Sequence, residues 1–407
     1  MDQILVGIDV GTTKVCTLVG EIGEDENLRI IGVGVVPARG MRKGVIVNVP
    51  EAIQAIRASV EKAERISGYD IERAHISLAG AHVSSINSRG VVAVQRGDRG
   101  ILPEDVDRAL DAARAIAIPH DREVIHVVPR GFNVDGQEGI RDPLGMVGFR
   151  LEVEAHIITG AVSSIHNLIK CIEDADVGVD ELVLDPLASG EAVLTDTERE
   201  MGVVLVDIGG GTTDIAVFIE GSIWHTTILG VGGNHLTNDI AVVLRMPNAA
   251  AEEAKLQHGH ACPDQVDPSE MIQVATFGDN TPTRMPRREL AQVIEARVEE
   301  IFSLVMQEIK RSGYDGLLPA GVVLCGGTAQ LRGIREMGRQ VLKLPIRVGG
   351  PSDLLGLTDS IMTPAFATSV GLLKWGQRQG AAGPGGRAPG VGRRLLGWFK
   401  TLLPDRG

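Results

Sequence analysis

The chain has 407 residues, of which 43% are apolar and 23% charged, and its formal net charge is −13. This length exceeds that of one simple core, so we expect a globular α/β protein of two or more domains, and the acidic balance argues against a nucleic-acid partner. No run of 18 apolar residues is present and the N-terminus lacks a basic region, so we expect neither a membrane span nor a signal peptide.

The first expected element is a β-hairpin over residues 4–19, whose two strands are rich in apolar β-branched residues. Its turn consists of Gly11, Thr12, Thr13 and Lys14. Glycine lets successive N–H groups converge on an anion, threonine hydroxyls add donors, and lysine adds a positive charge, so the turn suits phosphate. Asp9, near the end of the first strand, would repel bare phosphate, and we expect it to hold a hydrated Mg²⁺.

Strand, helix and strand are expected to follow this hairpin. Residues 32–49 are expected to be mainly strand. A helix begins at Pro50, a residue favoured in the first helical turn, and ends at Ser67 before Gly68. A further strand is expected over residues 75–78.

Residues 83–158 interrupt this pattern and look like an insertion without a catalytic cluster. The pattern predicts a small α+β subdomain with a strand pair around 84–94, a helix between Pro103 and Pro119, and strands over 124–128, 132–134 and 151–158. Glu152, Glu154 and His156 alternate along the last of these strands and therefore share one face. We expect that face to be a solvated surface.

Two helices and a strand are expected between the insertion and residue 200. The first helix covers residues 162–175, a short strand covers 181–184, and the second helix covers 185–193. Asp185 stands at the N-terminal end of the second helix, where an acidic residue is favourable.

The segment 203–218 repeats the first hairpin. Asp207 takes the place that Asp9 has in the first copy. The second turn contains Gly209, Gly210, Gly211, Thr212 and Thr213. A chain with two matched phosphate-binding hairpins is expected to form two similar lobes with a nucleotide between them.

Helices are expected over residues 236–244, 249–257 and 289–310, with loop and strand of undefined course over 263–287. Gly233 and Asn234 precede the first of these helices and are expected to contribute to cofactor binding, and Glu252 and Lys255 lie on the second. A third glycine motif follows, made of a buried strand, the turn Gly326, Gly327, Thr328 and a helix. A base or ribose can lie against the bare backbone of such a turn, so we expect it to bind adenosine.

The C-terminal segment differs from the rest of the chain. Residues 376–407 carry six Lys or Arg and one Asp, a net charge of +5, which leaves −18 for residues 1–375. Six Gly and two Pro among residues 376–390 predict a flexible linker. Residues 391–403 fit an amphipathic helix of about 20 Å, which is too short to cross a bilayer.

The two faces of this amphipathic helix differ in chemistry. The apolar face carries Val391, Leu395, Leu396, Trp398, Phe399, Leu402 and Leu403. The opposite face carries Arg393, Arg394, Lys400 and Thr401. We expect the helix to lie in the headgroup plane of an anionic membrane, with docking on the protein's own body as the alternative. One helix binds weakly, but many copies on a polymer would bind firmly through avidity.

The order of these motifs resembles the order found in the superfamily of actin, sugar kinases and chaperone ATPases. More closely, the chain is similar to the FtsA family of bacterial cell-division proteins from residue 3 to 375 and in its tail. The most specific stretches are residues 39–48, 123–129, 142–146, 150–156 and 252–255. The resemblance implies an α/β, actin-like fold of two lobes, duplicated and ribonuclease-H-like, with an inserted α+β subdomain named 1C.

The resemblance also implies subdomain boundaries. Subdomain 1A would comprise residues 1–82 and 161–200, 1C residues 83–160, 2A residues 201–230 and 313–375, and 2B residues 231–312. The linker 376–390 and the membrane-targeting helix 391–403 would follow.

Several activities follow from the same resemblance. It implies ATP with Mg²⁺ in the central cleft, polymerisation of the chain into protofilaments, and a place on the cytoplasmic face of the cell membrane at the division site. It also implies binding of the C-terminal peptide of the tubulin-like FtsZ on subdomain 2B and recruitment of later division proteins.

Four cysteines without a C-x-x-C pair are expected to be reduced thiols, which suits the cytoplasm.

Site roles are carried over by position. Phosphate binding falls to the glycine, threonine and lysine residues of the two turns, and Mg²⁺ binding through water falls to Asp9 and Asp207. Glu252 and Lys255 match positions near ribose and adenine. Asp185 matches a carboxylate that positions water in relatives, but aspartate is shorter than the glutamate of several relatives, so we expect any hydrolysis to be slow.

The FtsZ peptide is expected near Arg284, Arg287, Arg288 and Arg297, because a basic groove suits an acidic peptide. The alternative is that these arginines form a solvated face. Two other functions remain open from the sequence: a small-molecule kinase of the same superfamily, and an ATP-binding scaffold of type IV pilus assembly. A kinase would need a further catalytic base, and a pilus scaffold generally lacks such a basic C-terminal helix.

Overall fold

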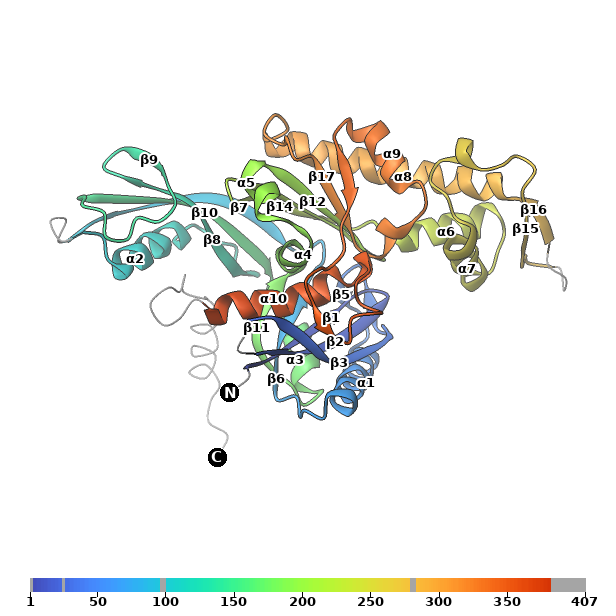
Figure 1. Cartoon of the computed structure of the whole chain (residues 1–407), viewed down its shortest axis with the longest axis horizontal. Coiled ribbons are helices and arrows are strands. Elements are labelled where there is room, and N and C mark those ends of the chain that lie inside the picture. Colours follow the sequence, from blue (N-terminus) through green and yellow to red (C-terminus); the bar gives the residue numbers. More distant parts are fainter. Residues whose placement is uncertain (1–2, 24–25, 96–99, 279–282, 382–407) are drawn as a thin grey trace.

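The computed structural model of the protein describes residues 3–23, 26–95, 100–278 and 283–381. Figure 1 shows a first lobe at the bottom, a second lobe above it, and an inserted sheet that projects to the left. Within the described ranges, no helix has the length and apolar character that a membrane crossing needs.

The first lobe is built on a six-stranded sheet of order β11-β6-β1-β2-β3-β19. Its strands are β1 (Gln3–Val10), β2 (Lys14–Ile22), β3 (Leu28–Pro37), β6 (Arg73–Leu78), β11 (Gly178–Leu184) and β19 (Leu355–Gly356). Strands β1 and β2 form the expected antiparallel hairpin, and β6 pairs parallel to β1. The helices of this lobe are α1 (Val49–Ser67), α3 (Val162–Glu173), α4 (Asp185–Val193) and α10 (Ala367–Ala381).

Helix α1 forms where the sequence predicts it. The Asn48 side chain accepts a hydrogen bond from the Glu51 N–H and caps the first turn, and Gly68 in the left-handed conformation ends the helix. The strand expected over residues 32–49 is instead divided into β3, β4 (Met41–Arg42) and β5 (Val45–Ile46). Gly40, with positive φ, lies in the break between β3 and β4. Lys43 and Gly44, also with positive φ, turn the chain between β4 and β5.

The second lobe repeats this plan with a five-stranded sheet of order β14-β13-β12-β17-β18. Its strands are β12 (Val203–Ile208), β13 (Thr213–Ile219), β14 (Ser222–Leu229), β17 (Val322–Cys325) and β18 (Ile346–Val348). As in the first lobe, three antiparallel strands are followed by a strand that pairs parallel to the first of them. The predicted duplication of the lobes is therefore confirmed.

Helices cover the second lobe, which also bears a small hairpin at the right of Figure 1. The helices are α5 (Asp196–Met201), α6 (Gly233–Val243), α7 (Asn248–His258), α8 (Arg287–Ser312) and α9 (Ile334–Leu342). Strands β15 (Met271–Val274) and β16 (Thr283–Pro286) form the hairpin. Short 3₁₀ helices are found in the connecting segments, namely η2 (Pro263–Gln265), η3 (Gly327–Gln330) and η4 (Pro364–Phe366).

The insert is a four-stranded sheet of order β7-β10-β8-β9 with one helix. Its elements are β7 (Ser84–Ala93), α2 (Pro103–Arg114), β8 (Arg122–Val134), β9 (Gln137–Ile140) and β10 (Arg150–Ala161). The strand pair expected around residues 84–94 is the single strand β7. The two strands expected over 124–128 and 132–134 are one strand, β8, because a register shift opposite Glu154 and Ala155 accommodates Pro129.

One face of β10 was predicted incorrectly. Glu154 is exposed, but Glu152 is buried and His156 is only 1% exposed. His156 is buried because it packs against the second lobe, where its Nε2 lies 2.9 Å from Thr226 Oγ1 on β14. Glu152 instead pairs with Arg89 and Arg150 of the insert.

Two helices join the lobes at the centre of the molecule. In Figure 1, α4 and α10 lie between the two sheets, and a Cβ on Gly371 of α10 would overlap with the Ala188 carbonyl of α4. Residues 376–381, expected to be linker, belong to α10, where the Arg378 guanidinium pairs with Glu191. Tertiary contacts thus override the glycine content of this segment. The remainder of the expected linker lies outside the described residues.

Candidate functional site

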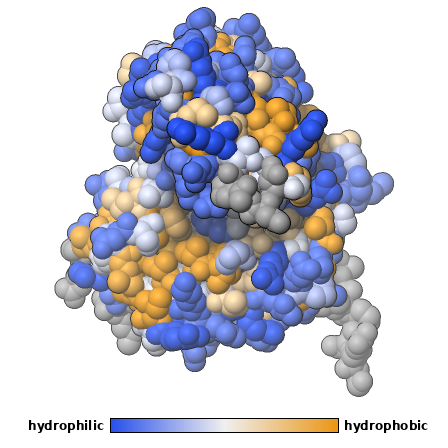
Figure 2. All heavy atoms as spheres, turned by 90° about the vertical axis from the view of Figure 1, so that its right-hand side faces the viewer, coloured by the Kyte–Doolittle hydropathy of each residue, from blue (hydrophilic) through white to orange (hydrophobic). Residues whose placement is uncertain are grey.

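A cavity of about 520 Å³ lies between the two lobes. The hollow between the upper and lower bodies in Figure 2, which shows the end bearing α6 and α7, corresponds to the division between the lobes. The predicted site residues that line the cavity are Asp9, Gly11, Thr12, Thr13, Lys14, Asp185, Asp207, Gly209, Gly210, Thr212, Gly233, Asn234, Glu252, Lys255, Gly326, Gly327 and Thr328. The fold therefore brings nearly all of the predicted nucleotide site together.

The two phosphate turns meet at the cavity. A Cβ on Gly210 would overlap with the methyl group of Thr13, and a Cβ on Gly211 would lie 2.6 Å from Thr12 Oγ1. Only glycine permits this approach of the lobes. Gly211 and Thr213 are not among the cavity-lining residues, and the Thr213 hydroxyl donates to the Val231 carbonyl at 2.8 Å. The Thr213 hydroxyl is thus engaged within the second lobe.

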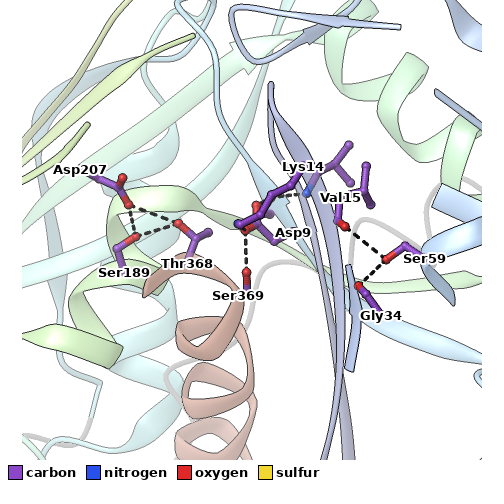
Figure 3. A network of polar contacts seen from close by, with 11 residues as sticks. Asp9, Lys14, Val15, Gly34, Ser59, Ser189, Asp207, Thr368 and Ser369 are labelled. Carbon is purple, nitrogen blue, oxygen red and sulfur yellow. Dashed lines mark hydrogen bonds and ion pairs between the residues drawn. The ribbon is translucent and has the colours of Figure 1, made fainter. Parts of the chain in front are cut away.

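Hydroxyl groups on the two central helices orient the paired aspartates, as Figure 3 shows. Asp207 accepts hydrogen bonds from Ser189 Oγ on α4 at 2.6 Å and from Thr368 Oγ1 on α10 at 3.3 Å. Asp9 accepts one from Ser369 Oγ on α10 at 2.7 Å. Both carboxylates therefore depend on the helices that link the lobes.

Lys14 is paired with Asp9 inside the cavity. Its ammonium lies 3.1 Å from Asp9 Oδ2 and 4.8 Å from the centre of the Phe366 ring. Burial opposes the charge, but the negative neighbours outweigh it, led by Asp9, and the net effect raises the pKa of Lys14. The lysine is thus a charged group in the folded protein.

Two further carboxylates in the cavity lack a complete set of partners. Asp185 Oδ1 and Asp214 Oδ1 are buried and have no hydrogen-bond partner among the described residues. Burial raises the pKa of both groups. The charges of Asp214, Asp9 and Asp207 raise the pKa of Asp185 further, and those of Asp207 and Asp9 raise the pKa of Asp214 further. Asp214 was not predicted, although its register position opposite Asp207 on the second hairpin was a signal for it.

The other end of the cavity is lined by both polar and apolar side chains. Lys255 Nζ lies 2.7 Å from Glu252 Oε2 and 2.9 Å from Thr237 Oγ1. Leu256, which is 73% exposed, and Leu331 also line this end. They were not predicted, because a leucine, whether on a helix as Leu256 is or between helices as Leu331 is, gives no sign in the sequence that it borders a cavity. Their apolar surface suits a flat base.

The four predicted partner arginines do not form a free basic groove. Arg287 pairs with Glu270, Arg288 with Asp264, and Arg297 with Asp239 and Glu300. Arg284 is exposed on β16 and has no ion pair within the described part of the chain.

A second, shallower cavity of about 350 Å³ lies between α6 and α8 and includes Arg297. Its apolar residues are Val242, Val243, Val293 and Ala296. Val242 and Val243 are 68% and 60% exposed. The predicted membrane residues from Val391 to Leu403 lie outside the described residues.

Among the described residues, no group of three or more His, Cys, Asp or Glu side chains is arranged to bind a metal ion directly. The expectation for Asp9 and Asp207 was binding through water, which needs fewer protein ligands.

Comparison with known proteins places the chain in a family. The family model "Cell division protein FtsA" matches residues 204–371, and "SHS2 domain inserted in FTSA" matches residues 80–159. The chain is 44% identical over 381 residues to the cell division protein FtsA of Pseudomonas aeruginosa, an alignment that covers 94% of this chain and 91% of the relative. This chain belongs to the FtsA family. It is therefore an actin-like cell-division protein, as the sequence motifs predicted.

Solved structures of more distant proteins show the same fold. A chain of the PilM–PilN type IV pilus biogenesis complex has a TM-score of 0.66 at 15% identity, and the match covers 92% of this chain and 98% of that chain. MreB5 of Spiroplasma citri bound to AMPPNP has a TM-score of 0.57 at 14% identity, covering 94% and 99%. At this identity the likeness concerns the fold alone, and it confirms the predicted actin-like α/β architecture.

Proposed function

We propose that this FtsA-family chain binds ATP in the cavity between its lobes and uses it to control assembly. The observation that carries the proposal is the meeting of two matched glycine–threonine turns, one from each lobe, in a single cavity. The N-terminus of α6, at Gly233 and Asn234, lines the same cavity, and the positive end of its helix dipole suits phosphate. The N–H groups of these two residues donate to the Gly209 and Gly210 carbonyls, which fixes the second turn against the helix. The related fold of MreB5 was solved with AMPPNP bound, which supports the same ligand class here.

The donor set also fits a hydrated Mg²⁺. Asp9 and Asp207 lie on opposite lobes at the cavity, and the unpartnered oxygens of Asp185 and Asp214 leave acceptors for water molecules of an ion. When bound, the ion would offset negative charge on the phosphates. The hydroxyls of Ser189, Thr368 and Ser369 would hold the two carboxylates in place.

ATP is proposed to act mainly as a conformational ligand. A nucleotide that contacts both turns stabilises the arrangement in which the lobes are close, and shifts the population toward it. Asp185 is the proposed water-positioning group, but its buried carboxyl has a raised pKa and a short side chain. A short side chain holds the attacking water less closely, so we expect slow hydrolysis.

Calorimetry of Gly210→Asp tests the nucleotide site. The new side chain would overlap with Thr13 and place a negative charge at the phosphates, so we expect ATP affinity to fall by at least about tenfold. Gly316→Asp is the matched control, because Gly316 is exposed and a Cβ there meets no atom within 4 Å. Undiminished ATP affinity of Gly210→Asp would contradict the proposal.

The wider role follows from the family and the tail. The chain would polymerise on the cytoplasmic face of the cell membrane, tether FtsZ filaments at the division septum and recruit later division proteins. The predicted amphipathic helix would be the anchor. The subdomain boundaries given above for 1A, 1C, 2A and 2B are part of this proposal.

The FtsZ peptide is proposed to bind the second lobe around Arg284 and α8. Arg284 is the predicted arginine without a carboxylate partner in the described residues, so its charge is available to an acidic peptide. The apolar residues between α6 and α8, next to Arg297, could receive apolar side chains of the same peptide.

A further inference from the structure

The β4–β5 hairpin places a cation beside the cavity that has no part in the proposed function so far. Lys43 and Gly44 form its turn, with φ of 51° and 75°. Gly44 lines the cavity, and its N–H donates to Thr12 Oγ1 at 3.2 Å. Lys43 therefore stands next to the phosphate turn of the first lobe.

Lys43 also reaches the second lobe. A Cβ on Gly211 would lie 3.0 Å from Lys43 Cα, and a Cβ on Gly230 would lie 3.9 Å from Lys43 Nζ. Burial, and then the nearby charge of Lys43, lower the pKa of His235 in the first turn of α6. The Lys43 ammonium thus lies beside the Gly230 loop that precedes α6, and the next residue in the hairpin, Gly44, lines the cavity.

The charges in the cavity leave a need for another cation. Four aspartates line it, at positions 9, 185, 207 and 214. The two lysines that line it are already paired, Lys14 with Asp9 and Lys255 with Glu252. A triphosphate would add more negative charge, and repulsion between like charges is strong in a cavity shielded from water.

Lys43 is available to supply that charge. It forms no hydrogen bond or ion pair in the part of the chain that the structure describes. Arg332 also lines the cavity, but it follows Leu331 directly. It therefore lies at the end that suits the base and not at the phosphate turns. Lysine carries a point charge on a flexible stem, so its ammonium can turn from the Gly230 loop toward a phosphate.

We propose that Lys43 contacts the terminal phosphate of a bound nucleoside triphosphate and makes the cleft prefer triphosphate to diphosphate. The inference rests on the proposed nucleotide function. The hairpin belongs to the first lobe, and the ammonium lies beside Gly230 of the second. The contact with the terminal phosphate would therefore affect both lobes.

The test compares the affinity of the full chain for AMPPNP and for ADP, each with Mg²⁺, by calorimetry. Lys43→Asn removes the charge and suits the turn, since asparagine tolerates positive φ. We expect about tenfold weaker AMPPNP binding and less than about twofold change for ADP. Arg42→Gln, an exposed position on the same hairpin, removes an equal charge and should change neither affinity. Lys43→Arg should keep the preference.

Two results would overturn the role of Lys43. One is unchanged AMPPNP affinity in Lys43→Asn, and the other is an equal loss for AMPPNP and ADP, which would indicate a general effect on the cleft. If the unaltered chain binds neither nucleotide, the proposed function itself fails together with this inference. If it binds both and only the Lys43 comparison fails, the proposed function stands.

Discussion

At the scale of single residues, the four cavity aspartates are held in different ways. Asp9 and Asp207 receive hydrogen bonds from hydroxyl groups, whereas Asp185 and Asp214 each keep one buried oxygen without a partner. An unpartnered buried carboxylate costs stability when it is ionised. These two groups therefore oppose folding of the nucleotide-free chain and are suited to a bound cation.

Asp214→Asn is expected to stabilise the nucleotide-free protein at neutral pH. Burial raises the pKa of Asp214, and the charges of Asp207 and Asp9 raise it further. A raised folded-state pKa means that stability is full below the ordinary aspartate pKa near 4 and is lost as pH rises through the higher value. Thermal unfolding should show a Tm gain of about 2–5 °C at pH 8 that shrinks toward pH 4.5.

The control for this prediction is Asp70→Asn, at an exposed position. It should give no pH-dependent difference from the unaltered chain. A melting temperature of Asp214→Asn that equals or falls below that of the unaltered chain at every pH would show that the Asp214 carboxylate does not destabilise the fold.

Sequence alone predicted most of the candidate site because its residues stand in repeated local motifs. Asp9 and Asp207 occupy matching places in two hairpins, and the duplication points to a shared cavity. Leu256, Leu331 and Lys43 were not predicted, because their relation to the cavity arises only when the lobes meet. The pairing of Arg287, Arg288 and Arg297 was missed for the same reason, since the partner carboxylates lie on other elements.

At the scale of elements, the insert is fastened to β14, the edge strand of the second lobe (Figure 1). His156 on β10 lies 2.6 Å from Asn87 Oδ1 and 2.9 Å from Thr226 Oγ1. The Arg130 guanidinium lies 4.0 Å from the centre of the Trp224 ring, an arrangement that stabilises a cation. The insert therefore links the lobes in addition to α4 and α10, so a movement between the lobes must also act on the insert.

This contact is expected to weaken in acid. Burial, with smaller contributions from His225 and Arg130, lowers the pKa of His156 to about 3. The unfolded chain takes up the proton near the ordinary value of about 6.5, so stability is lost as pH falls from about 6.5 toward 3. His156→Gln cannot titrate, and its loss of unfolding free energy between pH 7 and 5 should be smaller by about 2 kcal/mol.

Denaturant unfolding at the two pH values measures this difference. His120→Gln, at an exposed position of the same insert, is the control and should keep the pH dependence of the unaltered chain. His126, also buried, has its pKa lowered to about 4 by burial and contributes equally in all three proteins. An identical pH dependence in His156→Gln and the unaltered chain would exclude His156 as the cause.

Most of the fold could be predicted from apolar periodicity and end signals. Helix α1 is an example, because Asn48, Pro50 and Gly68 mark its ends locally. The errors occur where distant contacts decide the outcome. Strand β8 continues past Pro129 because β10 pairs with it across a register shift, and α10 continues past Gly376 because it packs on the first lobe.

At the scale of the whole molecule, charge separates the body from the tail. Residues 1–375 carry −18 and residues 376–407 carry +5. An anionic membrane repels such a body, so the proposed attachment would have to come from the tail, through basic side chains near the headgroups and apolar ones in the acyl boundary. Weak attachment of one chain becomes firm when many chains are joined in a polymer.

Trp398→Glu tests this separation of roles. Tryptophan supplies the largest apolar area of the predicted helix, and a glutamate in its place would meet both the acyl boundary and anionic headgroups unfavourably. In co-sedimentation with vesicles of phosphatidylglycerol and phosphatidylcholine, we expect binding to fall by at least about tenfold. Ala388→Glu makes the same change of charge outside the predicted helix and should retain most of the binding. If Trp398→Glu sediments with the vesicles as the unaltered chain does, the tail is not the anchor, and the acidic body must reach the membrane by another route.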